Sequence, residues 1–76
     1  MKKVIVKFES IVQIQNFVNE MGRFSSNVDL VSGTRTVDAK SIIGVFSLDI
    51  ANPIILEANG KDENAVIDAV KSITVQ

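Results

Sequence analysis

Residues 28–48 have the sequence VDLVSGTRTVDAKSIIGVFSL, and two periodicities meet within this stretch. Apolar and polar residues alternate on both sides of Ser32-Gly33, which is typical of two strands joined by a tight turn. The residues of this hairpin expected to face the core are Val28, Leu30, Val37 and Ala39. A second, short helix is predicted over Ser41–Leu48, with Ser41 at its N-cap position.

The residues before the hairpin predict a strand followed by a helix. Val4, Val6 and Phe8 fall on one face of an extended chain and Lys3 and Lys7 on the other, so a strand is expected over Lys2–Phe8. From Ser10 to Met21 the period changes to that of an amphipathic helix. Its expected inner face is formed by Ile11, Ile14, Phe17, Val18 and Met21. Ser10 and Gln13 fit a capping box, and Gly22 is the predicted stop.

The residues after the short helix predict a further strand and a last helix. Asn52-Pro53 is expected to turn, and Ile54–Ala58 to form the strand, because proline is tolerated only at a strand's start. After a turn at Asn59-Gly60, Asp62 is predicted to cap the last helix. The expected inner face of that helix is formed by Val66, Val70 and Ile73, helped by Ala69.

The predicted element order is β-α-β-β-α-β-α over a single domain, residues 1–76. Four strands and two amphipathic helices favour an α+β sandwich with the helices on one face of an antiparallel sheet. The acidic residues Asp29, Asp62 and Glu63 are spaced as caps and solvated side chains, so no metal site is expected.

Composition excludes several classes of function. The chain has neither histidine nor cysteine, so it lacks the commonest general base, the best nucleophile and the usual ligands of zinc and haem. We therefore expect no enzyme and no cofactor. The net charge is −1, which argues against nucleic acid as a partner. No apolar run approaches the ~18 residues of a membrane span, and no signal peptide is predicted, so a cytoplasmic protein is expected.

Three segments resemble the HPr family, the small phosphocarriers of the bacterial sugar phosphotransferase system. They are Arg35–Leu48, Phe17–Phe24, and Gly60–Glu63 followed by Ala65. The resemblance runs without a gap from about Ser10 to Ala51. It implies an HPr-like open-faced β-sandwich whose sheet has the strand order 1-4-2-3, numbered along the chain.

The resemblance places a different chemistry at the family's phosphorylation site. The family carries phosphate on a histidine that caps the first helix, with an arginine two residues later and then a proline. Ser10, Val12 and Gln13 occupy those positions here, and Asp49 occupies that of a glycine near the active loop. A protonated imidazole leaves phosphorus readily, whereas a serine alkoxide leaves poorly. Ser10 is therefore interpreted as a helix cap, with phosphate acceptance or anion binding as the alternative.

Ser41 matches the serine that a dedicated kinase phosphorylates in some HPr proteins. Phosphorylation at a helix N-terminus is electrostatically favourable, and Lys40 could add a charge-assisted contact. Plain capping is the alternative. In HPr the residues matching Ile42, Ile43 and Phe46 form an exposed apolar patch that partner proteins bind. Here they are either such a docking surface or additional core, with Val45 and Leu48 turned inward.

The sequence therefore predicts an HPr-like protein without the phospho-accepting histidine, acting as a regulatory or interaction module. Expected partners are proteins of the type HPr binds, namely a kinase, a transcriptional regulator or phosphotransferase components. Two alternatives stay open: a degenerate phosphocarrier that uses another nucleophile, and a structural domain with an unrelated partner.

Overall fold

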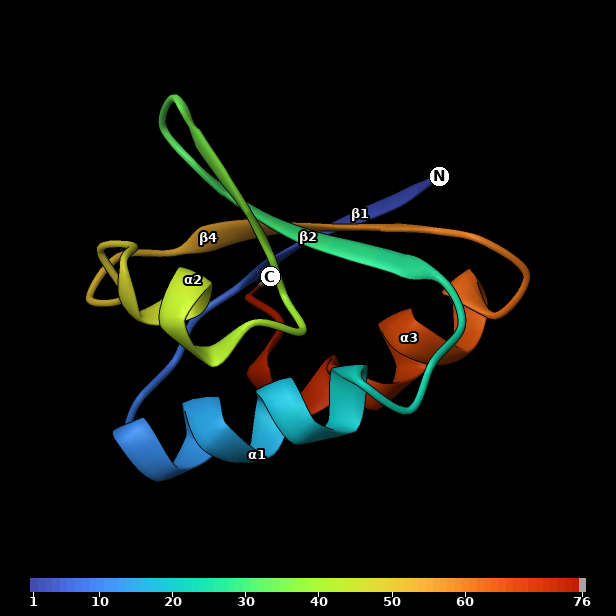
Figure 1. Cartoon of the computed structure of the whole chain (residues 1–76), viewed down its shortest axis with the longest axis horizontal. Coiled ribbons are helices and arrows are strands. Elements are labelled where there is room, and N and C mark those ends of the chain that lie inside the picture. Colours follow the sequence, from blue (N-terminus) through green and yellow to red (C-terminus); the bar gives the residue numbers. More distant parts are fainter. Residues whose placement is uncertain (76) are drawn as a thin grey trace.

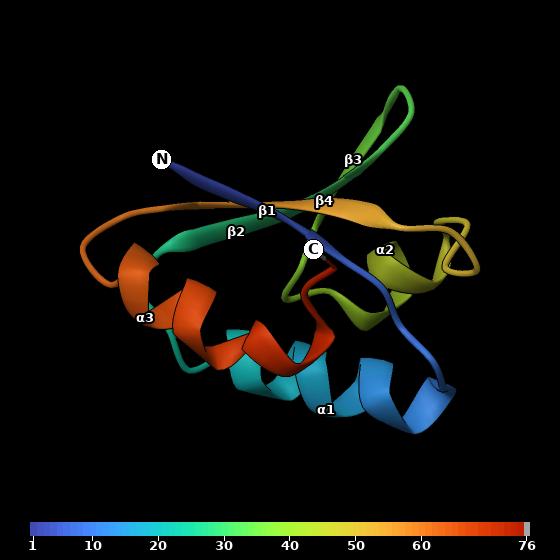
Figure 2. The same ribbon diagram turned by 180° about the vertical axis from the view of Figure 1, so that it is seen from behind.

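Four antiparallel strands form one sheet in the order β1-β4-β2-β3. The computed structural model describes residues 1–75, so Gln76, the last residue of the expected domain, lies outside the description. The strands are β1 (Lys2–Val6), β2 (Asn27–Ser32), β3 (Arg35–Asp38) and β4 (Ile54–Asn59). Helices α1 (Ile11–Met21) and α3 (Glu63–Ala69) lie beneath one face of the sheet, and α2 (Ile42–Phe46) lies near one end of α1 (Figures 1 and 2). The predicted class, element order and strand order are confirmed.

The core lies between the inner face of the sheet and the helices. Alternate residues of each strand point into it, as the hairpin pattern predicted. The helices contribute Ile14, Phe17, Val18 and Met21 from α1, Val45 from α2 and Val66 from α3. Phe8 and Phe17 meet edge to face, with ring centroids 5.0 Å apart. None of the helices within residues 1–75 has the length or the apolar run that a membrane crossing requires.

β1 ends at Val6 rather than at Phe8. Pairing of β1 with β4 stops at Val6 and Ile54, because the residues before Ile54 form the turn at Asn52-Pro53 and are not part of β4. The chain nevertheless continues toward the core, where Phe8 is buried. On the outer edge of β1, the Lys7 N–H donates to the Ile73 carbonyl at 2.9 Å, and the Val75 N–H donates to the Ile5 carbonyl at 2.8 Å. The last described residues thus cover that edge.

The ends of two helices differ from prediction. Ile11 lies on the predicted apolar stripe of α1, yet its side chain is exposed because it borders an open hollow instead of the core. The last helix does not run unbroken to Ile73. It ends at Ala69, and Lys71–Ile73 form a 3₁₀ turn that still places Ile73 against the core.

Asp62 stands at the N-cap of α3 but makes no capping hydrogen bond, contrary to prediction. Its carboxylate instead accepts from the backbone N–H groups of Ser25 and Ser26, both at 2.9 Å, and from both serine hydroxyls. The Ser26 hydroxyl also accepts from the Asp62 N–H at 3.2 Å. The carboxylate thus joins the segment after α1 to the start of α3, and its hydrogen bond from the Ser26 hydroxyl is the main reason that the pKa of Asp62 falls to about 2.

Acid should weaken this connection in a defined range. The pKa of Asp62 is about 2 in the folded chain against an ordinary value of 3.8, so its stabilising effect is complete above about pH 4 and is lost as the pH falls through 2. We predict that Asp62→Asn lowers the urea midpoint at about pH 7, and that wild type and variant converge near pH 2. Asp68→Asn, at an exposed ion pair with Lys71, is the control and should change little. A deficit of the Asp62 variant that does not change with pH would contradict this account.

The contact between Asp62 and the Ser25-Ser26 segment also requires a glycine at position 60, because the Gly60 backbone lies close to Ser26. Its φ is +154°, and a β-carbon there would lie 2.5 Å from Ser26 Oγ and 2.7 Å from Ser26 Cα. Gly33, in the β2–β3 turn, has φ +60° but open space around it. We predict that Gly60→Ala destabilises the domain by at least about 2 kcal/mol, and Gly33→Ala by about 1 kcal/mol. Equal losses in chemical denaturation would show that the contact with Ser26 is not tight.

Candidate functional site

Helix α2 is short because a serine caps it at each end. The Ser41 hydroxyl accepts from the Gly44 N–H at 3.2 Å, as predicted for an N-cap. The Ser47 hydroxyl donates to the Gly44 carbonyl at 2.6 Å, so the helix ends at Phe46 rather than Leu48. Arg35 of β3 then holds this end, donating to the Ser47 carbonyl at 3.0 Å and to its hydroxyl at 2.9 Å. The caps therefore set the length of α2, and Arg35 ties its C-terminal end to β3.

With one turn and a half, α2 buries one side and exposes the rest. Val45 is fully buried, and Leu48 beyond the helix is buried too, as predicted. Ile43 is 81% exposed, and Ile42 and Phe46 are exposed to a smaller degree. We refer to Ile42, Ile43 and Phe46 as the α2 patch. Three neighbouring apolar side chains in contact with water are more than scattered surface hydrophobes, and such a group is typical of a binding surface.

Ser10 caps α1 with its hydroxyl already engaged. Its oxygen accepts from the Gln13 N–H at 3.1 Å. The Gln13 side chain accepts in turn from the Glu9 N–H at 2.7 Å, one residue earlier than a standard capping box would place it. Ser10 also lines an open hollow of about 270 Å³. The other residues around that hollow are Phe8, Glu9, Ile11, Ile50 and Ala51.

The surroundings of Ser10 are apolar or negative. Ile11 and Val12 are both exposed in the first turn of α1. Lys7, the nearest cation in sequence, lies 3.9 Å from the carboxylate of Glu9. The Asp49 carboxylate accepts from Asn52 Nδ2 at 2.7 Å and from the Ala51 N–H at 3.3 Å, so it organises the loop that forms one wall of the hollow. In the part of the chain that the structure describes, no arginine lines this hollow, so no guanidinium there could hold a phosphoryl group.

Lys40 does not reach toward Ser41 as the sequence suggested. Its ammonium donates to the Phe24 carbonyl at 2.8 Å, which ties the segment before α2 to the end of α1. The Asp38 carboxylate accepts from the Lys40 N–H at 2.9 Å, and this turns the backbone there. Ser41 itself is exposed. A modifying enzyme would therefore find an accessible hydroxyl, but no lysine poised beside it.

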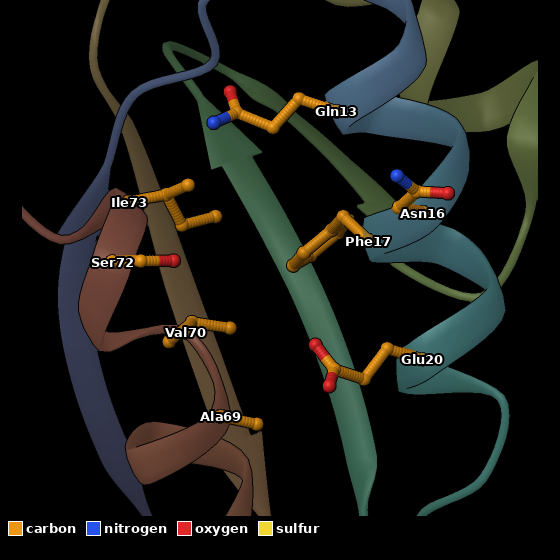
Figure 3. A pocket seen from close by; sticks show the side chains of 8 residues that line it. All are labelled: Gln13, Asn16, Phe17, Glu20, Ala69, Val70, Ser72 and Ile73. Atoms are coloured by element: carbon orange, nitrogen blue, oxygen red, sulfur yellow. The ribbon is translucent and has the colours of Figure 1, made fainter.

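A second hollow of about 130 Å³ separates α1 from the end of α3 (Figure 3). Phe17 and Val70 form its floor, and the exposed polar side chains of Asn16, Glu20 and Ser72 lie at its rim. Both hollows are smaller than the roughly 300 Å³ at which small-molecule pockets begin. Within residues 1–75 no three histidine, cysteine or acidic side chains are grouped closely enough to hold a metal ion.

Comparison with known proteins agrees with the fold. A family model described as the PTS HPr component phosphorylation site matches residues 7–75. The chain belongs to the HPr family. It is 35% identical over 74 residues to the HPr-like protein Crh of Halalkalibacterium halodurans, a match covering 91% of this chain and 88% of that protein. The phosphocarrier HPr of Cupriavidus necator is 41% identical over 54 residues, 68% of this chain but only 61% of that protein.

The crystal structure of HPr from Bacillus anthracis superposes with a TM-score of 0.81. The alignment covers 97% of this chain and 94% of that one at 28% identity. The 76 residues contain no histidine, so the HPr fold of this chain carries no imidazole.

Ile11 and Val12 form an exposed apolar pair that the sequence reasoning does not predict. The spacing of Ile11 predicts a core position, and Val12 enters the prediction only as the residue at the position of the family's arginine. The available signal was the helical period itself, because Val12 falls outside the inner stripe of Ile14, Phe17, Val18 and Met21. Figures 1 and 2 show α2 above the first half of α1, the helix that begins at Ile11.

Substitution should separate the α2 patch from the core. We predict that Ile43→Ser changes the free energy of unfolding by less than about 0.5 kcal/mol, because that side chain loses little contact with water on folding. Val45→Ala, two residues along the same helix, should cost about 2 kcal/mol, since it empties buried space. Denaturant titrations of the two variants measure both values. If Ile43→Ser lowered the free energy of unfolding as much as Val45→Ala, the α2 patch would belong to the core and the prediction would be wrong.

Proposed function

We propose that this protein is an HPr-like regulatory module that docks on a protein partner through the α2 patch and does not relay phosphate. The observation that carries the proposal is the exposure of Ile42, Ile43 and Phe46 on a helix that is tied to other elements on both sides, by Arg35 after it and by Lys40 before it. Burying such side chains against a partner would remove apolar surface from water, which stabilises a complex by roughly 25 cal/mol for each Å² of apolar surface buried. Fixed orientation lowers the entropy lost on binding.

The first turn of α1 supports the same proposal. At the positions that match the family's histidine and arginine, this chain has Ser10 and Val12. A serine ester is too inert to pass phosphate onward, and a valine cannot form the bidentate contact that would hold it. Ile11 and Val12 extend exposed apolar surface to this end of the molecule. The face that would meet a phosphate-donating protein is thus better suited to apolar contact than to holding an anion.

Ser41 is the proposed regulatory residue. Its exposed hydroxyl directly precedes Ile42 and Ile43, so a phosphate there would place two negative charges beside the apolar contact. Such a charge would strengthen docking on a partner with arginines at its rim and weaken docking on an acidic one. The proposed partners are proteins of the type HPr binds: a kinase, a transcriptional regulator or phosphotransferase components. No catalytic role is proposed for this chain.

A kinase assay tests the regulatory proposal. With an HPr kinase and ATP, wild type and Ser10→Ala should each gain one phosphate by mass spectrometry, and Ser41→Ala should gain none. Ile43→Ser should be phosphorylated roughly tenfold more slowly, because it keeps the acceptor and loses the docking side chain. An unmodified wild type, beside an HPr that the same enzyme modifies, would contradict the switch at Ser41. An unchanged rate in Ile43→Ser would contradict docking through the α2 patch.

A further inference from the structure

The sheet face opposite the helices carries side chains in rows that cross the strands. Within residues 1–75 no helix covers this face (Figures 1 and 2). The strand register places Ile5 opposite Ile55, and Ile55 opposite Val31. Val75 extends the row beyond β1, since its N–H donates to the Ile5 carbonyl. Ile5, Ile55 and Val75 are each 41 to 47% exposed, and Val31 is half-buried. We refer to these four residues as the apolar row.

The neighbouring row is charged. The register aligns Lys3 with Glu57, Glu57 with Asp29, and Asp29 with Asp38. Lys3 lies 3.5 Å from the Glu57 carboxylate. Within residues 1–75, neither Asp29 nor Asp38 has a cationic group within ion-pair distance, and Asp29 has an acidic residue opposite it on both sides. We refer to Glu57, Asp29 and Asp38 as the acidic row.

This arrangement is unfavourable in the isolated domain. Like charges directly opposite each other on neighbouring strands destabilise a sheet, and exposed isoleucines leave apolar surface in water. The two rows lie two residues apart along each strand, which is about 7 Å. A peptide segment lying along the rows could therefore direct apolar side chains to one row and cationic side chains to the other.

We propose that the open sheet face binds a cationic amphipathic segment of a partner protein. Its apolar side chains would cover the apolar row, and its lysines or arginines would neutralise the acidic row. This surface is separate from the α2 patch and does not depend on the function proposed for it. A partner bound here would leave α2 accessible, so the domain could connect two proteins.

The negative charge of the acidic row favours a cationic segment over the other molecules that could cover this face. A second copy of the chain, packed face to face about a twofold axis, would bring the same uncompensated carboxylates to the interface. Nucleic acid and anionic lipid headgroups would be repelled by the acidic row. An apolar segment without positive charge would leave Asp29 and Asp38 desolvated without a partner.

The probe for this proposal is the peptide acetyl-Lys-Leu-Lys-Leu-Lys-amide, titrated into the ¹⁵N-labelled protein. Amide shifts should change in β1, β2 and β4 and stay unchanged in α2. The counterpart acetyl-Glu-Leu-Glu-Leu-Glu-amide should produce no shift. Asp29→Lys should weaken binding of the lysine peptide roughly fivefold, and Ile55→Thr by about threefold. Glu20→Lys makes the same change of charge on α1 and should leave the affinity within about twofold.

Thermal unfolding gives a second readout that does not involve the peptide. Asp29→Lys should raise the melting temperature, because it replaces repulsion from Glu57 and Asp38 with attraction, and the gain should shrink in high salt. Shift changes confined to α1 and α2, equal loss of affinity in Asp29→Lys and Glu20→Lys, or absence of any shift would each overturn the proposal. Equal binding of the glutamate peptide would do the same.

Discussion

The inner face of the sheet packs against α1 and α3, and in a chain of 76 residues this contact supplies most of the buried apolar side chains. A domain of this size has too little apolar surface to cover both faces of its sheet. Two consequences follow from burial on one side only. The opposite face keeps its isoleucines and carboxylates in water, and α2, at one end of the two layers, buries only Val45. Both proposed binding surfaces are regions that this packing leaves uncovered.

Hydrogen bonds between distant segments hold the two layers in register. The Asp62 carboxylate joins Ser25 and Ser26 to the start of α3. Lys40 joins the hairpin to the end of α1, and Arg35 joins β3 to the end of α2. Each uses a charged side chain to bind backbone groups that would otherwise lack partners near a helix end. Such bonds explain how a domain without disulfides keeps a short helix in one orientation.

Periodicity predicted the elements well because it reports local burial. It placed Val28, Leu30, Ile14 and Val66 in the core, and all four are buried. It failed where the partner of a side chain is distant in sequence. The sequence predicts Asp62 as a cap, since nothing local reveals that Ser26 lies beside it. It predicts Lys40 as a contact for a phosphate on Ser41 because the two residues are adjacent, whereas the Lys40 ammonium binds the Phe24 carbonyl in this chain. The exposure of Ile11 likewise depends on distant residues, because Ile11 borders the hollow that Ile50 and Ala51 also line.

The candidate site was predictable in its residues but not in its surroundings. Ser10, Val12, Ser41 and the α2 patch follow from resemblance and helical phase. The hollow formed with Ile50 and Ala51 follows only from the folded chain. That hollow matters for the chemistry, because a phosphoryl group at Ser10 would meet apolar walls and the carboxylate of Glu9 rather than a guanidinium. The residues around Ser10 therefore suit an apolar contact better than a phosphate.

Phosphoryl relay from phosphoenolpyruvate is the most direct test of the central claim, that this chain has no group able to accept phosphate and release it again. The purified protein is incubated with labelled phosphoenolpyruvate, the first enzyme of the phosphotransferase system and a sugar-specific component, beside an HPr as positive control. The account predicts label on the HPr and its acceptor, and none on this protein. Label that enters this protein and passes on to the sugar-specific component would contradict it.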